Sequence, residues 1–235
     1  YISQGLLPSI QPESPSVIIS ELSYNPSSSQ DHEYIELYNP NGYAVDVSGW
    51  TLDSSATLTL QGGSVIPANS YALIVKNDPA FRQQYGPGEL IIGTYQGNFS
   101  NDGGTATLQR SNGSIADTLS YQVSGSWPSA SNGQGSSLAL IRTSANSNLA
   151  ACWAPSPNGG TPGQANNNLD EAWVNANSSN CIDRVISNSA ITDSNRLSDT
   201  GSDSSRLVIL AYSSFILTAL ILLNKGLRRV NKFDV

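Results

Sequence analysis

Residues 33–50 constrain the fold of this chain more strongly than any other stretch, because they join a clear strand pattern to a strong turn. Ile35 and Leu37 alternate with tyrosines and a glutamate, which is the period-two pattern of a strand with one buried face. The sequence Asn-Pro-Asn-Gly at residues 39–42 then favours a tight reversal. A second short strand at residues 45–48 is expected to follow this turn.

Trp50 ends this stretch and is expected to cover one end of a small all-β core. Gly49 precedes it and lets the backbone bend. Further strand candidates lie at residues 17–22, 57–60, 64–66, 71–75, 90–94, 105–109, 115–121 and 138–142. Short strands at this spacing predict a sandwich or a barrel.

One helix is expected inside the domain, at residues 78–85. Asp78 can cap its N-terminus and Pro79 suits its first turn. The segment ends at Gly-Pro-Gly, residues 86–88, which cannot continue a helix. The composition therefore indicates a β-sheet protein with a single helical insertion.

The composition divides the chain into four parts. A proline-containing lead-in is expected at residues 1–15 and a folded domain at residues 16–166. Residues 167–205 are rich in Asn, Ser and Asp and predict a flexible polar stalk. Residues 206–235 predict a membrane anchor with a basic cytoplasmic tail.

Cys152 and Cys181 are the two cysteines of the chain. Charged residues make up 12% of the sequence, a low share that is typical of extracellular β proteins, where disulfides form. One disulfide that ties the start of the stalk to the domain is therefore expected, and two unpaired thiols are the alternative. Neither cysteine has a second Cys or His at the spacing of a zinc site.

An uncharged segment of 17 residues begins at Leu207 and ends at Leu223, at the short end for a membrane span. Arg206 precedes this segment, and four basic residues follow it. A buried core helix is the alternative, although no partner helix is expected. The positive-inside rule places the C-terminus in the cytoplasm on the basis of Lys225, Arg228, Arg229 and Lys232.

From residue 16 to residue 166 the chain resembles the lamin tail domain, an immunoglobulin-like module that also occurs in exported prokaryotic proteins. The matching blocks keep the family's order and spacing, and they lie at residues 18–26, 33–40, 45–52, 66–71, 98–104, 135–138 and 159–163. The resemblance implies an all-β, immunoglobulin-like β-sandwich without catalytic residues, used for binding and assembly. Fold analogy alone says little about function.

A second resemblance concerns the C-terminus, where the chain is similar to a sortase cell-wall sorting signal. Such a signal places a Leu-Pro-x-Thr-Gly motif before an apolar segment and a basic tail, and a sortase would attack the Thr200 carbonyl. Ser198 stands where the family has proline. A chance match in a polar stalk, with a permanent single-span anchor, is the alternative. The motif residues are Leu197, Ser198, Asp199, Thr200 and Gly201.

Catalytic and ligand-binding patterns are weak in this sequence. His32 is the single histidine, and its acidic neighbours would point to the opposite face of a strand, so a hydrolase is not expected. Loop acids such as Asp31, Asp46 and Asp102 have no calcium-motif spacing. Aromatic residues such as Tyr34, Tyr38 and Trp127 could form a ligand surface, but in a sandwich they are more often core.

The sequence therefore predicts a non-catalytic interaction or adhesion module displayed at the cell surface, with no cofactor and no metal. The expected partners are an unidentified protein or envelope component, the membrane, and a sortase that recognises the C-terminal signal. The alternative is a structural subunit of an envelope assembly that packs through its sheet edges. Up to Arg206 the chain carries 17 acidic and 7 basic residues, which argues against binding nucleic acid.

Overall fold

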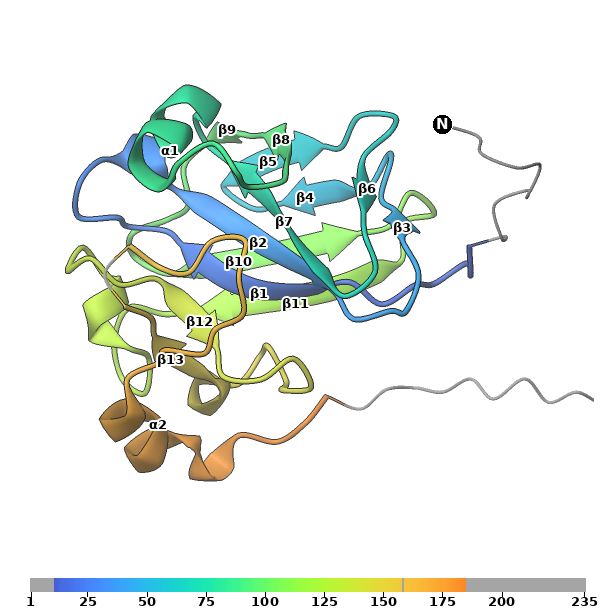
Figure 1. Ribbon diagram of the computed structural model, residues 1–235. Coiled ribbons are helices and arrows are strands. Elements are labelled where there is room, and N and C mark those ends of the chain that lie inside the picture. Colours follow the sequence, from blue (N-terminus) through green and yellow to red (C-terminus); the bar gives the residue numbers. More distant parts are fainter. Residues whose placement is uncertain (1–10, 158, 185–235) are drawn as a thin grey trace, which may run out of the picture. The chain divides into compact units, whose positions relative to one another are not determined.

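The computed structural model describes residues 11–157 and 159–184, and strands of two main sheets build its architecture (Figure 1). The six-stranded sheet has the order β13-β12-β1-β2-β7-β8, in which only the β7–β8 pair is parallel. Its strands are β1 (Ile18–Ser23), β2 (Tyr34–Asn39), β7 (Ser70–Val75), β8 (Ile91–Thr94), β12 (Leu138–Leu140) and β13 (Trp153–Pro155).

The second sheet has five strands in the order β11-β10-β4-β5-β9, and a small two-stranded sheet pairs β3 with β6. All of these pairs are antiparallel. The strands are β4 (Thr51–Asp53), β5 (Ala56–Thr59), β9 (Gln96–Gly97), β10 (Gly104–Gln109) and β11 (Ile115–Tyr121), with β3 (Val45–Asp46) and β6 (Val65–Ile66).

Helical segments are short and lie outside the sheets. The α-helices of the described residues are α1 (Asp78–Tyr85) and α2 (Glu171–Asn177). The 3-10 turns are η1 (Gln30–His32), η2 (Ser129–Ser131), η3 (Ala150–Cys152) and η4 (Ser178–Asn180). No helix in the described residues is long and apolar enough to cross a membrane.

The hydrophobic core lies between the two main sheets. Buried and partly exposed side chains alternate along β10, where Ala106 and Leu108 are fully buried and Thr107 between them is not. Trp50 belongs to this core and is 2% exposed, and Gly49 before it has a φ of +74°, as the expected bend requires. The fold is therefore all-β, consistent with the expected immunoglobulin-like sandwich.

Strand β2 differs from the prediction of one buried face, because both of its faces are buried. Tyr34 and Glu36 are 0% exposed, as are Ile35 and Leu37 on the opposite face. Helix α1 packs on the second face, where the ring of Phe81 meets that of Tyr34 edge to face at 5.7 Å. The alternation of residues along β2 therefore distinguishes two faces that are both buried, and does not mark a buried face and a solvent-exposed face.

The second short strand also differs from its expected place. Strand β3 pairs with β6 and not with β2. The side chain of Asn39 holds the intervening loop: its amide donates to the carbonyl oxygens of Tyr43 at 2.9 Å and Ile66 at 3.0 Å, and its oxygen accepts from the Asn41 N–H at 2.9 Å. These bonds replace the backbone pairing of a tight hairpin.

Helix α1 has the predicted bounds, but its N-cap is Asn77, whose side chain accepts from the Ala80 N–H at 3.1 Å. Asp78 is the first helical residue instead. The polar segment after residue 166 also differs from the stalk that the composition suggested. Residues 167–184 include α2 and η4, and they remain attached to the sandwich through Trp173, whose indole N–H donates to the Trp153 carbonyl at 3.1 Å.

Candidate functional site

Two of the four outer sheet edges are covered by other parts of the chain. Along β11, the Ser147 hydroxyl donates to the Thr118 carbonyl at 2.9 Å, so the loop of residues 144–148 closes this edge. Along β13, helix α2 covers the edge through the bond from Trp173 to Trp153. Covered edges do not offer free backbone groups for pairing with another chain.

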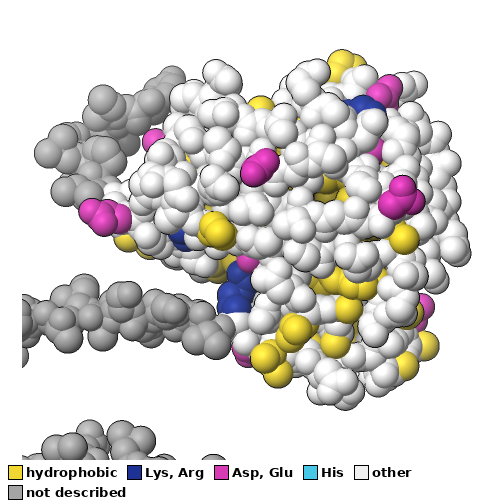
Figure 2. Space-filling view, turned by 180° about the vertical axis from the view of Figure 1, so that it is seen from behind, with side chains coloured by type: hydrophobic (Ala, Val, Ile, Leu, Met, Phe, Trp, Pro, Cys, Tyr) yellow, Lys and Arg dark blue, Asp and Glu magenta, His cyan; other side chains and the backbone are white. Residues whose placement is uncertain are grey.

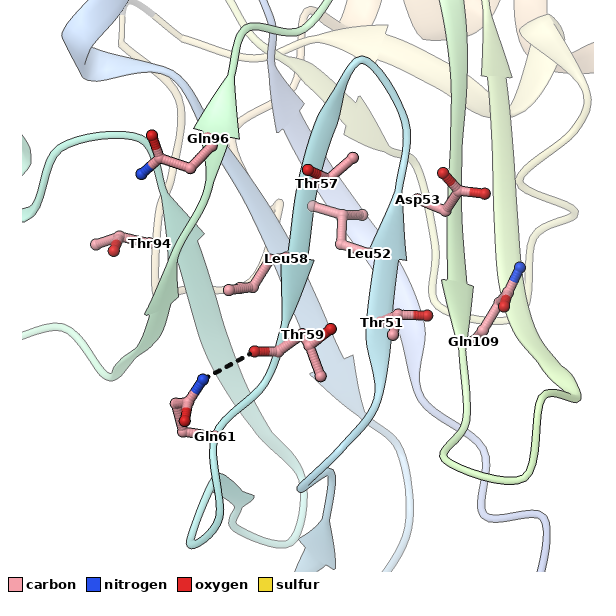
Figure 3. Close-up of a pocket in the computed structure, with 10 residues that line it drawn as sticks. All are labelled: Thr51, Leu52, Asp53, Thr57, Leu58, Thr59, Gln61, Thr94, Gln96 and Gln109. Atoms are coloured by element: carbon pink, nitrogen blue, oxygen red, sulfur yellow. Dashed lines mark hydrogen bonds between the residues drawn. The ribbon is translucent and has the colours of Figure 1, made fainter.

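The opposite side of the sandwich is more open, between β5 and β9 of one sheet and β8 of the other. Strand β9 pairs with β5 at only two positions, Ala56 and Thr57. A groove with a volume of about 530 Å³ opens here on the outer side of β4 and β5 (Figure 3). It is lined by Thr51, Leu52, Asp53, Thr57, Leu58, Thr59, Gln61, Thr94, Gln96 and Gln109.

The lining of this groove follows from strand register. Positions that pair across neighbouring strands point to the same face of a sheet. Thr51 is paired with Thr59 on β5 and with Gln109 on β10, and Thr107 is paired with Asp53. These residues form an outward face of hydroxyl, amide and carboxylate groups, while their apolar neighbours in sequence point into the core.

The chemistry of the groove is that of a neutral, hydrogen-bonding surface. Threonine hydroxyls and glutamine amides both donate and accept hydrogen bonds. Asp53 is the single charged residue of the lining, which contains no Lys or Arg. Figure 2 shows a surface that is mostly uncharged, with acidic side chains spread singly over it. The groove is therefore suited to polar partners and not to polyanions.

A pair of buried carboxylates lies on the other side of the six-stranded sheet, under residues 159–163. Glu21 accepts hydrogen bonds from the Tyr34 hydroxyl at 2.8 Å and the Thr161 N–H at 2.9 Å, and from the Ser137 hydroxyl. Glu36 accepts from the Gly163 N–H at 2.6 Å. The two carboxylates thereby hold the loop of residues 159–163 against the sheet.

Burial and mutual repulsion disfavour the ionised state of this pair. Burial raises the pKa of Glu21 above its usual value. Burial also raises the pKa of Glu36 well above its usual value, and the nearby Glu21 carboxylate adds to the effect. The hydrogen-bond partners of both carboxylates are hydroxyl and N–H donors of the fold itself. We therefore interpret this pair as a structural element.

A third buried carboxylate, Glu33, lies at the start of β2. Its Oε2 accepts from the Tyr95 hydroxyl at 2.8 Å and from the Phe99 N–H at 3.0 Å. Its Oε1 is buried and has no hydrogen-bond partner among the described residues. Burial raises the pKa of this carboxyl group, and the Lys76 ammonium partly opposes that change.

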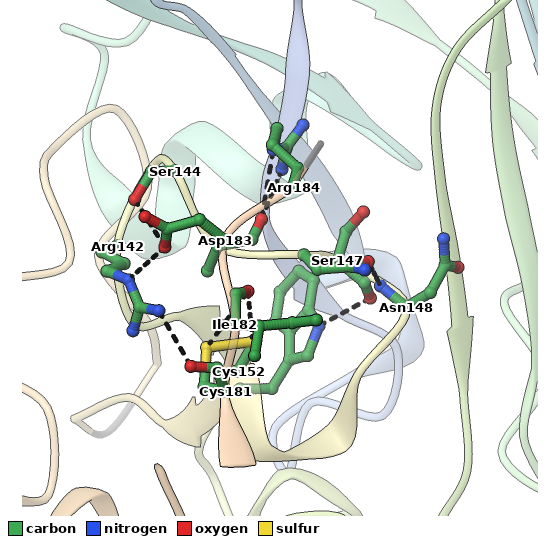
Figure 4. Close-up of a disulfide and its surroundings, with 12 residues drawn as sticks. Arg142, Ser144, Ser147, Asn148, Cys152, Cys181, Ile182, Asp183 and Arg184 are labelled. Atoms are coloured by element: carbon green, nitrogen blue, oxygen red, sulfur yellow. Dashed lines mark hydrogen bonds and ion pairs between the residues drawn. A yellow bond between two sulfur atoms is a disulfide. The ribbon is translucent and has the colours of Figure 1, made fainter. Parts of the chain in front are cut away.

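The predicted disulfide is confirmed. Cys152 and Cys181 are joined, and Figure 4 shows the surrounding contacts that fix the segment after α2. Arg142 Nε lies 2.8 Å from Asp183 Oδ1, and the Arg184 guanidinium donates to the Ala145 carbonyl at 2.9 Å. The disulfide therefore joins the end of the described chain to β13 and its preceding turn.

His32 does not form a catalytic arrangement with its neighbours. Its Nδ1 lies 2.7 Å from the Ser28 hydroxyl in an exposed loop. Over the described residues, no carboxylate hydrogen-bonds the imidazole to complete a triad, and no group of three or more His, Cys, Asp or Glu side chains could hold a metal ion. The Lys76 ammonium lies 4.0 Å from the Asp31 carboxylate.

The remaining predicted site residues lie outside the described residues. They are the sorting motif at 197–201, the apolar segment from Leu207 to Leu223, and the basic residues that follow it. The groove beside β5 was not predicted. The alternation of threonine with apolar residues at 56–60 and 105–109 is the pattern that would have revealed its polar face.

The fold and this surface define a class: an all-β domain with a polar groove and no assembled catalytic site in its described part. Residues 10–122 match the family model of the lamin tail domain, somewhat under half of the chain. The match indicates a non-enzymatic protein-interaction module, since this family is typically non-catalytic. No curated protein matches the chain.

Proposed function

We propose that this protein is a non-catalytic adhesion module displayed on the outer face of a cell, and that it binds its partner in the groove beside β5. The groove is the observation that carries the proposal. It opens on the outer side of β4 and β5, and eight of its ten lining residues have hydrogen-bonding side chains, of which only that of Asp53 is charged. The similarity to the lamin tail domain supports an interaction role.

Two features support display outside the cytoplasm. The Cys152–Cys181 disulfide is typical of an oxidising compartment. The apolar segment from Leu207 to Leu223 and the basic residues after it have the pattern of a C-terminal anchor. We propose that this anchor either remains in the membrane or is removed by a sortase, which would cleave after Thr200 and attach the Thr200 carbonyl to the cell wall.

Binding of the full-length protein to surface material tests the role of the groove. Beads that carry the protein are mixed with intact cells, isolated envelopes and purified neutral polysaccharide. Thr59→Arg places a long cation in the groove and should reduce the bound fraction at least tenfold. Thr105→Arg changes an exposed threonine of the same sheet outside the groove, and should bind like the parent. Equal binding by both variants, or no binding to any material, would contradict the proposal.

The intact mass of the protein from its native cells tests the anchor. Wall and membrane fractions are separated before the measurement. A chain that ends at Thr200 and carries a wall fragment supports sorting, and a chain that ends at Val235 in the membrane fraction supports a permanent anchor. Recovery of the full chain from the cytosol would contradict surface display altogether.

A structural subunit that packs through its sheet edges is the less favoured alternative. The edges of β11 and β13 are covered by residues 144–148 and by α2, so pairing there would require these segments to leave. Co-purification of the protein in a fixed assembly that survives Thr59→Arg would favour this alternative.

A further inference from the structure

Three side chains with complementary chemistry meet at the end of the sandwich near β9. Lys76 follows β7, Asn98 follows β9, and Glu33 precedes β2. The Lys76 N–H donates to the Glu33 carbonyl at 3.0 Å, which fixes the backbone positions of these two residues. The Lys76 ammonium in turn donates a hydrogen bond to the side-chain oxygen of Asn98. A primary amine therefore directly contacts a carboxamide.

The Glu33 carboxyl group lies beside the same carboxamide residue. Its Oε2 accepts from the N–H of Phe99, the residue after Asn98. Its Oε1 is buried without a hydrogen-bond partner among the described residues. The rings of Tyr95 and Phe99 lie 5.0 Å apart and are almost fully buried, whereas the neighbouring Asn98 is exposed. A buried carboxyl with one unpaired oxygen can carry a proton in either direction.

We propose that Lys76 and Asn98 form an intramolecular amide cross-link between the lysine Nζ and the asparagine Cγ, with Glu33 as the proton carrier. The contact between the two groups supplies the proximity that such a reaction needs. Nothing besides the three side chains is required. The site is thus a self-modification site, which goes beyond the proposed binding role of the groove.

The reaction balances without an oxidant or a cofactor. The Lys76 ammonium first gives up one proton to solvent, and its neutral Nζ then forms a bond to Cγ of Asn98. The Glu33 carboxyl group protonates the amide oxygen as the tetrahedral intermediate forms, and takes that proton back as the intermediate collapses. The second proton that Nζ loses passes to Nδ2, the Cγ–Nδ2 bond breaks, and ammonia leaves. The product is a secondary amide, and the protein is lighter by one ammonia molecule.

The Lys76 side chain is 21% exposed, and Asp31 Oδ1 lies 4.0 Å from its Nζ. This contact holds the amine in place beside Asn98. The cross-link would join two positions 22 residues apart, one beside each main sheet, at the open side of the sandwich.

Mass spectrometry of the full-length protein, after reduction of its disulfide, tests the proposal. The expected mass is lower than that of the sequence by one ammonia, and a proteolytic digest should contain a branched peptide that links Lys76 to Asn98. Peptide mapping is essential, because succinimide formation at Asn-Gly sequences such as residues 41–42 and 112–113 also releases ammonia. An intact mass equal to that of the sequence, or ammonia loss mapped only to these sequences, would overturn the proposal.

Variants separate the roles of the three residues. The Lys76→Arg and Asn98→Ala variants should each have the full mass of their sequence, without loss of ammonia from this site, and should give no branched peptide. Asn101→Ala changes a neighbouring exposed amide of the same loop, and should leave the cross-link intact. Glu33→Gln keeps the size of the buried side chain and should lower the yield of branched peptide at least tenfold. A folded Glu33→Gln variant with full cross-linking would exclude Glu33 as the proton carrier, while cross-linking in Lys76→Arg would refute the assignment itself.

Discussion

Glu21 and Glu36 are directly paired across β1 and β2, and both of their carboxylates are buried. Like charges in this arrangement repel each other, and burial removes the water that would otherwise stabilise them. The pair persists because hydrogen-bond donors surround it, including the N–H groups of Thr161 and Gly163. The loop that closes the second face of β2 is therefore held by acceptors that the sheet presents.

The substitution Glu36→Gln should make the stability of the protein less dependent on pH. Burial and Glu21 raise the pKa of Glu36 in the folded state, so its contribution is fully present below the usual pKa of 4.5 and is lost as pH rises through the raised value. The melting temperature of the parent should fall from about pH 4.5 upward. Thermal unfolding at a series of pH values should show a flatter profile for Glu36→Gln. The exposed control Glu13→Gln should keep the parent's slope, and equal slopes for all three proteins would contradict this account.

Gly160→Ala should destabilise the protein much more than Gly63→Ala. Both glycines have nearly the same positive φ, +89° and +88°, so both substitutions carry a similar backbone strain of about 1–2 kcal/mol. A Cβ at Gly160 would clash with the Tyr34 hydroxyl and the Glu21 carboxylate, whereas a Cβ at Gly63 meets nothing within 4 Å. Overpacking should add about 1–3 kcal/mol to the cost at Gly160.

Denaturant unfolding of the two glycine variants measures this difference directly. Circular dichroism of each variant before unfolding serves as the control for folding. Similar losses of stability in the two variants would mean that residues 159–163 can move away from the sheet without cost.

Local patterns predicted much of the fold, because they depend on neighbours in sequence. The strand that contains Ile35 and Leu37, the helix at 78–85 and the bend at Gly49 all follow from alternation, capping and backbone freedom. The second buried face of β2 did not follow. This face depends on α1 and on residues 159–163, which lie far away in the sequence. In addition, an acidic side chain such as that of Glu36 normally predicts a solvent-exposed position.

The candidate site was less predictable than the fold. The groove depends on which strands become neighbours, and the pairing of Thr51 with both Thr59 and Gln109 is a property of sheet order. The contact between Lys76 and Asn98 likewise requires β7 and β9 to meet. Helix α2 was missed because residues 167–184 are polar. They are ordered by the disulfide and by Trp173, and a low hydrophobic content cannot reveal such contacts.

Removal of the disulfide by Cys181→Ser should release the segment after residue 166 and lower the free energy of unfolding by about 3–4 kcal/mol. The reason is that the bond joins two cysteines 29 residues apart and fixes the end of the described chain to the turn before β13. Hydrogen exchange should accelerate in α2, residues 171–177, and remain slow in β1 and β2. Reduction of the parent protein should reproduce this pattern. Unchanged exchange in α2 would show that Trp173 alone retains the helix.

Asp117→Asn should lower the free energy of unfolding by about 1–3 kcal/mol, because this buried carboxylate satisfies donors from separate parts of the chain. It accepts from the Ile19 N–H at 2.9 Å and from the Ser147 hydroxyl at 2.7 Å, and Arg184 Nη1 lies 3.4 Å away. An amide would place an N–H where one of these donors now points.

The exposed Asp53 on β4 is a matched control, and Asp53→Asn should change the free energy of unfolding by no more than about 0.5 kcal/mol. Denaturant unfolding measures both variants, and hydrogen exchange shows where the loss occurs. If the cost in Asp117→Asn arises from the three donors, exchange should accelerate in the loop of residues 144–148 and at Arg184 together. Acceleration in only one of them would mean that Asp117 supports that segment alone, and that the edge of β11 is closed independently of the end of the described chain.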